Sequence, residues 1–265
     1  MKRTATLLAS VAALALALTG CGSSSDDAAA GGSTLEQVQD SGVLTVGTEG
    51  TYRPFSFHDD SGKLTGYDVE VIEAVADKMG VKAEFEETQW DSMFAGLEAK
   101  RFDVVANQVG VNAERQEKYL LSDPYTVSSG VVVTRSDDDS IKSFDDLKGK
   151  TTAQSLTSNF RKMAEEAGAK IEGVEGWAQS VALLKQGRVD ATVNDKLSFL
   201  DSQKTDNDTS IKIAAETEEK TTSAVALRKD SEDLRDAIDD ALDELEADGE
   251  LAAISKKYFG EDISK

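Results

Sequence analysis

Short apolar runs alternate with amphipathic segments through the first half of the chain. The apolar runs have the length and β-branched content of buried strands, whereas the amphipathic segments repeat every three or four residues, as helices do. The predicted strands are 43–46, 81–85 and 104–106, and the predicted helices are 67–79, 93–99 and a polar helix from about residue 112. Asp68 lies near the start of the first of these helices, so we expect it to cap that helix. This alternation predicts an α/β fold with largely parallel sheets.

A second series of the same kind begins after Tyr125. Its predicted strands are 131–133, 171–174, 189–193 and 211–214, and its predicted helices are 143–147, 158–167 and 177–186. Helices at 232–250 and 251–258 end the chain, and the first of them carries ten acidic residues around an apolar stripe, so its acids form a solvated face. Two consecutive α/β series predict two lobes, and ligand sites in such folds favour the cleft between lobes.

The first twenty residues have the pattern of an export signal. Lys2 and Arg3 precede an apolar run from Thr4 to Leu18 that is too short to span a bilayer. The run ends in Leu-Thr-Gly-Cys, which resembles a bacterial lipobox, in which Cys21 is lipidated and becomes the mature N-terminus. The alternative is an ordinary signal peptide with a stray cysteine.

Residues 22–33, GSSSDDAAAGGS, have the small, polar composition of a flexible tether. We therefore expect a signal peptide at 1–20 and a lipidated cysteine with its tether at 21–34. The folded part would be held outside the cytoplasm at a membrane surface. The acidic composition and the Ala-rich signal favour a Gram-positive surface slightly over a Gram-negative periplasm.

Charge and composition exclude several classes of function. The 265 residues carry a formal net charge of −21, which argues against nucleic-acid binding because little could neutralise a run of phosphates. One cysteine and one histidine argue against an intrachain disulfide, a Cys-based zinc cluster and a His-rich metal site. The sequence has no Gly-x-Ser-x-Gly elbow, glycine-rich dinucleotide fingerprint or complete phosphate loop. A binding protein without cofactor, rather than an enzyme, is the favoured interpretation.

Seven segments, in order and at similar spacing, resemble the bacterial extracellular solute-binding proteins, family 3, the amino-acid receptors of ABC importers. The segments are GTEGTYRPFSF at 47–57, LTGYDV at 64–69, RFDVV at 101–105, NAER at 112–115, SDPY at 122–125, GRVDA at 187–191 and ALRK at 226–229. Within the family, QWDSM at 89–93 and ANQV at 106–109 are most similar to the cystine-binding branch.

The resemblance implies a two-lobe periplasmic-binding-protein-like fold (type II), in which each lobe is a mainly parallel sheet flanked by helices. Two hinge strands would join the lobes, with crossings near 127–130 and 222–224. Lobe 1 would then comprise 35–127 plus 224–265, and lobe 2 would comprise 128–223.

The resemblance also implies how an amino acid would be held. Arg115 would grip the ligand carboxylate with its planar fork of donors, although it could instead be a surface arginine paired with a neighbouring glutamate. Asp195 would meet the ammonium, although it could instead cap the helix that begins at Lys196. The other implied site residues are Ser158 and Asn159 for the carboxylate, Asn107, Gln108 and Gly110 for the lobe 1 wall, Tyr52 and Trp90 for ring contacts, and Glu49 for the far ammonium of a long ligand. Tyr52 and Trp90 could instead be core aromatics.

These expectations together describe a monomeric, lipid-anchored receptor for a polar amino acid, with cystine favoured, that delivers its ligand to an ABC importer. Arg115 and Asp195 would lie on different lobes, so one ligand could satisfy both only in a closed cleft. Two alternatives stay open at this point. One is an enzyme on the same fold, similar to cyclohexadienyl dehydratase, and the other is a ligand sensor or adhesin.

Overall fold

A six-stranded mixed sheet forms the centre of lobe 1. The computed structural model describes residues 34–264, so the predicted signal peptide, Cys21 and the tether up to residue 33 lie outside the described part. The strand order is β5-β1-β6-β14-β7, and β8 pairs with β14 beside β7. These strands are β1 (Val43–Thr48), β5 (Lys82–Glu87), β6 (Val104–Gly110), β7 (Leu120–Leu121), β8 (Thr126–Ser128) and β14 (Thr221–Leu227). A small meander, β2 (Thr51–Tyr52), β3 (Ser56–His58) and β4 (Leu64–Thr65), follows β1.

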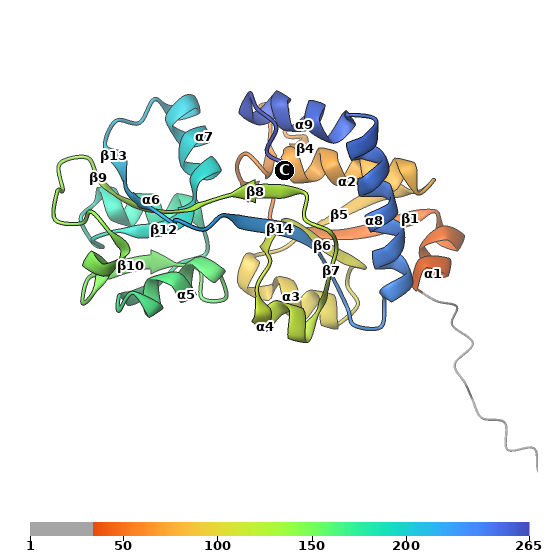
Figure 1. Ribbon diagram of the computed structural model, residues 1–265, viewed down its shortest axis with the longest axis horizontal. Coiled ribbons are helices and arrows are strands. Elements are labelled where there is room, and N and C mark those ends of the chain that lie inside the picture. Colours follow the sequence, from red (N-terminus) through yellow and green to blue (C-terminus); the bar gives the residue numbers. More distant parts are fainter. Residues whose placement is uncertain (1–33, 265) are drawn as a thin grey trace, which may run out of the picture. The chain divides into compact units, whose positions relative to one another are not determined.

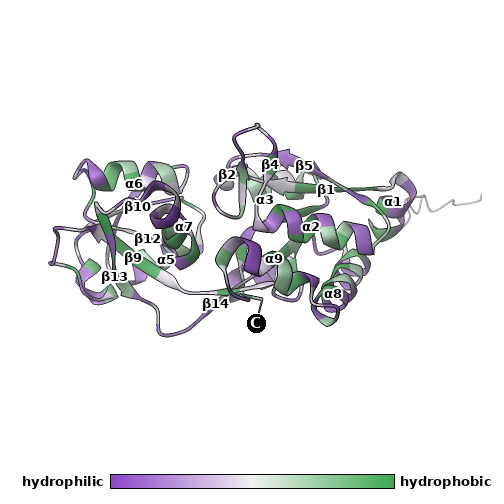
Figure 2. Cartoon of the chain, turned by 90° about the horizontal axis from the view of Figure 1, so that it is seen from above, coloured by the Kyte–Doolittle hydropathy of each residue, from purple (hydrophilic) through white to green (hydrophobic). Residues whose placement is uncertain are grey.

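Helices cover both faces of this sheet (Figure 1). They are α1 (Thr34–Ser41), α2 (Tyr67–Lys78), α3 (Trp90–Glu98), α4 (Ala113–Lys118), α8 (Glu232–Ala247) and α9 (Glu250–Phe259). Side chains alternate along β6, so Val104 and Ala106 join the core under α2 and α8, whereas Val105 and Val109 pack with α3 on the opposite face. The apolar stripe of α8 is buried and its acids face outward, as the sequence predicted (Figure 2).

Lobe 2 is built around β9 (Gly130–Arg135), which pairs antiparallel with β12 (Thr192–Asp195) and with β13 (Ile211–Glu216). The parallel pair β10 (Thr151–Gln154) and β11 (Lys170–Gly173) lies beside β12, joined to it through a parallel bridge between Thr152 and Ala191. The helices are α5 (Asn159–Glu166), α6 (Trp177–Lys185) and α7 (Lys196–Asp206), and a single 3₁₀ turn, η1 (Phe144–Leu147), replaces the predicted helix at 143–147.

The two-lobe α/β architecture predicted from the sequence is confirmed, with sheets that are mixed rather than mainly parallel. The parallel pairs are β1 with β5 and β6, and β10 with β11. The strands that carry the chain between the lobes, β9 and β14, instead pair antiparallel with their neighbours. The strands that join the lobes therefore run opposite to the strands they pair with in each sheet.

The two connections between the lobes are hydrogen-bonded to each other. β8 pairs antiparallel with the start of β14, with Thr222 opposite Val127 and Ser223 opposite Thr126. The outer edge of β8 is covered as well, since the Val127 backbone N–H donates to the Ile263 carbonyl at 2.7 Å. The hinge is therefore a two-stranded ribbon whose exposed edge is protected by the segment after α9.

Candidate functional site

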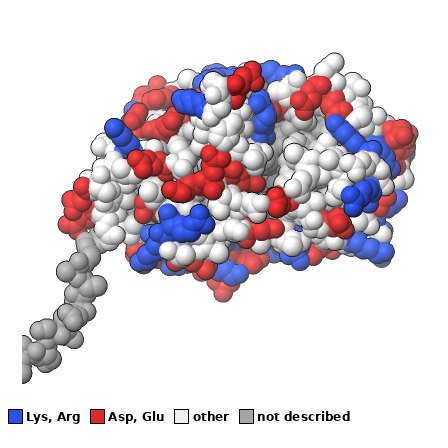
Figure 3. All heavy atoms as spheres, turned by 180° about the vertical axis from the view of Figure 1, so that it is seen from behind, with Lys and Arg blue, Asp and Glu red and all other residues white. Residues whose placement is uncertain are grey.

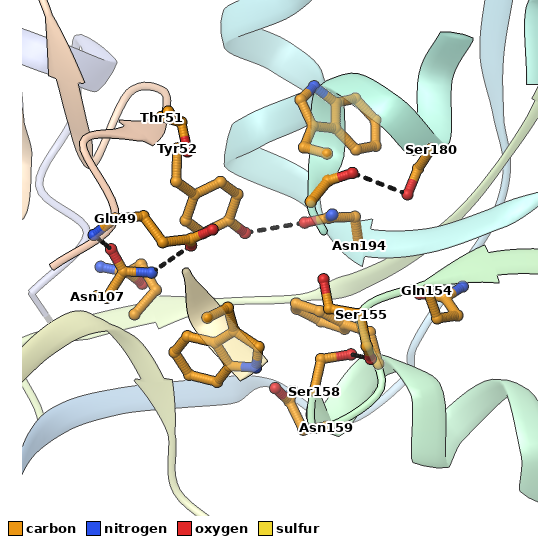
Figure 4. Close-up of a pocket in the computed structure, with 15 residues that line it drawn as sticks. Glu49, Thr51, Tyr52, Asn107, Gln154, Ser155, Ser158, Asn159, Ser180 and Asn194 are labelled. Carbon is orange, nitrogen blue, oxygen red and sulfur yellow. Dashed lines mark hydrogen bonds between the residues drawn. The ribbon is translucent and has the colours of Figure 1, made fainter. Parts of the chain in front are cut away.

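A pocket lies between the lobes and takes its lining from both (Figure 4). Lobe 1 contributes Glu49, Thr51, Tyr52, Trp90, Asn107 and Gln108, and lobe 2 contributes Gln154, Ser155, Ser158, Asn159, Phe160, Gly176, Trp177, Ser180 and Asn194. Most of these residues lie where a strand ends or a helix begins. Open α/β sheets place their ligand sites at such strand ends.

Glu49 and Asn107 form the acidic corner of the pocket. Asn107 Nδ2 donates to Glu49 Oε2 at 2.6 Å, and Asn107 Oδ1 accepts the Glu49 backbone N–H at 2.9 Å. Burial raises the pKa of the Glu49 carboxyl to about 7, the bond from Asn107 opposes that rise, and the charge of Asp91 adds to it. The only Asp or Glu among the described residues lining this pocket is therefore poised between its charged and neutral forms near neutral pH.

Gln108 is held in an unusual backbone conformation by Asp68. Its φ is +51°, a left-handed geometry that residues other than glycine rarely adopt. Asp68 accepts the Gln108 backbone N–H at 2.7 Å and its Nε2 at 2.6 Å, and Nε2 also reaches Thr126 Oγ1 at 3.1 Å. The predicted role of Asp68 as a helix cap is wrong, because Gly66 is the N-cap of α2 and the Asp68 carboxylate is used by a partner 40 residues away.

Aromatic side chains form much of the remaining wall. Tyr52 Oη donates to Asn194 Oδ1 at 2.8 Å across the lobe boundary, and Trp90 is almost fully buried. Phe160 and Trp177 line the pocket from lobe 2. The tyrosine and tryptophan rings offer flat apolar surface together with a polar group, and the Phe160 ring offers apolar surface alone.

Three lining side chains bring polar atoms that have no hydrogen-bond partner within the described residues. They are the Trp90 Nε1 and Gln154 Nε2 donors and the Gln108 Oε1 acceptor, and all three atoms are buried. Leaving a buried polar group unpaired costs about 1–3 kcal/mol, and native structures contain few of them. All three residues line one pocket, so a ligand that both accepts and donates hydrogen bonds is the partner we expect for these atoms.

The amino end of α5 faces the pocket from lobe 2. Ser158 is its N-cap and accepts the Arg161 backbone N–H at 3.0 Å, and Asn159 is its first residue. Both line the pocket. The free N–H groups and the positive end of the helix dipole favour a negatively charged group here.

Arg115 lies just outside this pocket, beside Ser158 and Asn159 in the adjoining groove. Its Nη1 donates to the Gly110 carbonyl at 2.8 Å and its Nη2 to the Thr157 carbonyl at 3.4 Å. Only 7% of Arg115 is exposed, and burial lowers the pKa of its guanidinium to about 10. Within the described structure, this guanidinium forms no ion pair with a neighbouring glutamate. Its hydrogen bonds go instead to backbone carbonyls of both lobes.

Asp195 also lies behind the lining, one residue after Asn194. Its carboxylate accepts Ser128 Oγ at 2.8 Å and the Leu197 backbone N–H at 2.7 Å, so it caps α7 and holds the first connection between the lobes. Burial raises the pKa of this carboxyl to about 6, against the opposing effect of both bonds. Capping is therefore part of its role, and a capping carboxylate can still present its other oxygen lone pairs.

The structure thus brings seven of the ten predicted site residues around one pocket and leaves Gly110, Arg115 and Asp195 directly behind its lining. A side chain on Gly110 would approach Asn159 to about 3.2 Å, which explains the small residue there. Eight lining residues were not predicted from the sequence: Thr51, Gln154, Ser155, Phe160, Gly176, Trp177, Ser180 and Asn194. Asn194 could have been found, since it immediately precedes Asp195 at the end of a predicted strand, whereas Trp177 gave no local signal beyond its place at a helix start.

Across 34–264, no group of three or more His, Cys, Asp or Glu side chains is arranged to hold a metal ion. In the same part of the chain, no helix has both the length and the apolar character needed to cross a bilayer. On the face drawn in Figure 3, acidic and basic side chains are intermingled.

Comparisons with known proteins agree with this geometry. The model of the family described as bacterial extracellular solute-binding proteins, family 3, matches residues 44–261. The chain is 55% identical over 260 residues to the L-cystine-binding protein TcyA of Bacillus subtilis (strain 168), covering 98% of this chain and 97% of that protein. It is 53% identical over 234 residues to a probable amino-acid ABC transporter-binding protein of Haemophilus influenzae, covering 88% and 91%.

Among solved structures, the chain is similar to the L-cystine solute receptor of Neisseria gonorrhoeae in the unliganded open conformation. The two are 51% identical, with a TM-score of 0.60, and the match covers 88% of this chain and 100% of that one.

Proposed function

Because the chain belongs to the bacterial extracellular solute-binding proteins, family 3, we propose that it binds L-cystine between its lobes and delivers it to an ABC importer. The observation that carries this proposal is the set of unpaired polar atoms around the pocket, two donors and one acceptor, at a site flanked by a helix amino end and by Glu49. An amino acid supplies the complementary carboxylate and ammonium. The relatives named for cystine support that choice of ligand.

The amino end of α5 and Arg115 would hold one carboxylate. Arg115 now donates to two backbone carbonyls, one from each lobe, and a carboxylate would accept bonds from this guanidinium more strongly than a neutral carbonyl does. Asp195 would meet the nearby ammonium, and Glu49 would meet the second ammonium of a long ligand. Tyr52 and Trp90 would pack against the apolar middle, and Asn107, Gln108, Ser158 and Asn159 would complete the polar lining.

Binding would be coupled to closure of the cleft. We propose that 35–127 with 224–265 and 128–223 move as two bodies about the β8–β14 ribbon. A ligand that bonds to both bodies favours the closed state. To shift the closed-to-open ratio from 1:99 to 99:1, the ligand must bind the closed state about 5.5 kcal/mol more tightly than the open state. A relative with 51% identity adopts an open conformation without ligand, which supports such a cycle.

We further propose that the protein is an exported, monomeric lipoprotein and not an enzyme. The lipobox at 18–21 supports lipidation of Cys21, and the tether that follows would let the lobes move freely above the membrane, on a Gram-positive surface by preference. Incorporation of a fatty-acid analogue into the wild type and its loss in Cys21→Ser would support the anchor. Unchanged labelling in that variant would overturn it.

Calorimetric titration of the purified protein tests the ligand. We expect one-to-one binding of L-cystine and much weaker binding of Gln, Glu, His and Arg. Arg115→Ala and Asp195→Ala should abolish binding, whereas Arg188→Ala, which changes an exposed arginine that does not line the pocket, should not. Tight binding of another amino acid would refute cystine but keep the receptor, and no binding across the series would refute both.

A further inference from the structure

Asp91 makes a cluster of bonds across the cleft without lining the pocket. It lies in the first turn of α3 in lobe 1, and its carboxylate reaches the loop that precedes α5 in lobe 2. Oδ1 accepts the Thr157 backbone N–H at 2.9 Å and Thr157 Oγ1 at 2.7 Å, and Oδ2 accepts the Leu156 backbone N–H at 3.2 Å. One exposed carboxylate therefore takes three hydrogen bonds from the opposite lobe.

The loop that Asp91 holds is the lobe 2 wall of the ligand pocket. Ser155 comes just before the bonded residues, and Ser158, Asn159 and Phe160 come just after them, and all four line the pocket. Lobe 1 holds the Thr157 residue a second time, because Arg115 Nη2 donates to its carbonyl. The amino end of α5 is thus fixed over the pocket by groups from the other lobe.

Other cross-cleft contacts are fewer or weaker. Tyr52 and Asn194 share one bond, and both belong to the pocket itself. Arg53 and Asp201 make one partly exposed ion pair at 3.3 Å, and such pairs contribute little to stability. The Asp91 bonds differ in two ways. Two of the three donors are backbone N–H groups, which need no further side-chain ordering, and the acceptor is the charged Asp91 carboxylate.

We propose that Asp91 is a positioning residue that latches the closed state and holds the α5 amino end against the ligand without touching it. Its three bonds join different lobes, so they exist only when the lobes are closed. Asp91 therefore shifts the open–closed equilibrium toward closure and slows ligand release. This inference rests on the proposed function for the identity of the ligand, but the latch itself concerns lobe closure.

The closing experiment compares Asp91→Ala with Asp59→Ala. Asp59 is a matched control, since it also accepts two backbone N–H groups and one hydroxyl, from Ser61 and Lys63, but entirely within one turn of lobe 1. The readouts are the L-cystine dissociation constant, the association and dissociation rates from tryptophan fluorescence, and the distance between fluorophores placed on the two lobes.

We expect Asp91→Ala to weaken L-cystine binding about tenfold to a hundredfold, with most of the change in the dissociation rate, and to lengthen the mean interlobe distance. Asp59→Ala should match the wild type in all three readouts. Asp91→Asn should be intermediate, because its Oδ1 can still accept both Thr157 donors while its amide faces the Leu156 N–H. That isosteric variant also keeps the test valid if the alanine variant is poorly folded.

A double variant with Thr157→Val completes the test. If the latch is real, removing the threonine hydroxyl should cost affinity in the wild type and nothing in Asp91→Ala. Wild-type dissociation rates and interlobe distances in Asp91→Ala would overturn the latch. If the wild type binds no L-cystine, the proposed ligand fails, and the interlobe distances of Asp91→Ala and Asp59→Ala alone decide the latch.

Discussion

Replacing Glu49 with glutamine should remove a pH dependence from ligand binding. Burial raises the pKa of the Glu49 carboxyl to about 7, so in the free protein this group is mostly neutral at pH 5 and half charged at pH 7. A ligand ammonium placed beside it would favour the charged form and lower that pKa. Binding at pH 5 must then expel a proton from Glu49, and this proton release weakens the affinity.

The size of the effect follows from the shift. If the ligand lowers the pKa of Glu49 from about 7 to about 5 or below, linkage predicts roughly 25-fold to 50-fold tighter binding at pH 7 than at pH 5. Glu49→Gln keeps a side-chain acceptor for Asn107 but carries no charge. We expect the substituted protein to bind more weakly at pH 7 and to lose the Glu49 share of the difference between pH 7 and pH 5. The smaller share that Asp195 contributes should remain, because burial raises its pKa to about 6 and a ligand ammonium would lower it.

Titration calorimetry at pH 5, 6 and 7, in two buffers of different ionisation enthalpy, measures both the affinity and the protons released. Glu98→Gln is the control, because Glu98 accepts a bond from Tyr119 and does not line the pocket. A wild-type affinity that is flat from pH 5 to pH 7 would refute the reasoning. A slope in Glu49→Gln as steep as in the wild type would move the titrating role to Asp195 alone, whose pKa burial raises to about 6.

Three further outcomes concern stability. Asp68→Asn places an amide against the two Gln108 donors, so it should lower the free energy of unfolding by about 1–3 kcal/mol, and an unchanged urea midpoint would contradict this. Burial raises the pKa of Asp68 to about 7 and that of Asp195 to about 6. The folded chain then binds more protons than the unfolded chain, so their stabilising contribution is complete below about pH 4 and is lost as the pH rises through 6 to 7. The urea midpoint should therefore fall between pH 5 and pH 8, and less so in Asp68→Asn. Gly96→Ala would put a methyl 2.7 Å from the Phe102 ring and should cost about 1–3 kcal/mol in thermal unfolding, partly regained with Phe102→Leu.

Hydrophobic periodicity predicted most elements but shortened those that carry the site. The strand predicted at 104–106 extends to Gly110, because Asn107 and Gln108 are polar yet buried in it. Their burial depends on Glu49 and Asp68, which lie far away in the sequence. A pattern of apolar positions therefore cannot predict a strand whose buried polar residues are hydrogen-bonded to residues far away in the sequence.

Family motifs predicted two residues of the candidate site that the structure brings together, Glu49 directly after β1 and Asn107 in the middle of β6. The hydrogen bonds between the lobes could not be predicted, because they depend on which backbone groups meet across the cleft. Asp91 illustrates this limit. It lies in the motif QWDSM, which is similar to the cystine-binding branch, but its three hydrogen-bond donors lie 65 and 66 residues further along the chain.

The strand order of lobe 1 has a consequence for how the chain folds. β14 lies inside the sheet, between β6 and β7, although it is the last strand of the chain, and its pairing with β6 joins residues more than 110 positions apart. Lobe 2 is made from one continuous stretch and contains no comparable long-range closure. During synthesis from the N-terminus, lobe 2 should therefore be completed first, because the core under α2 also needs the residues of α8, which are made later. The ligand pocket, which needs both lobes, would be the last part of the molecule to acquire its native form.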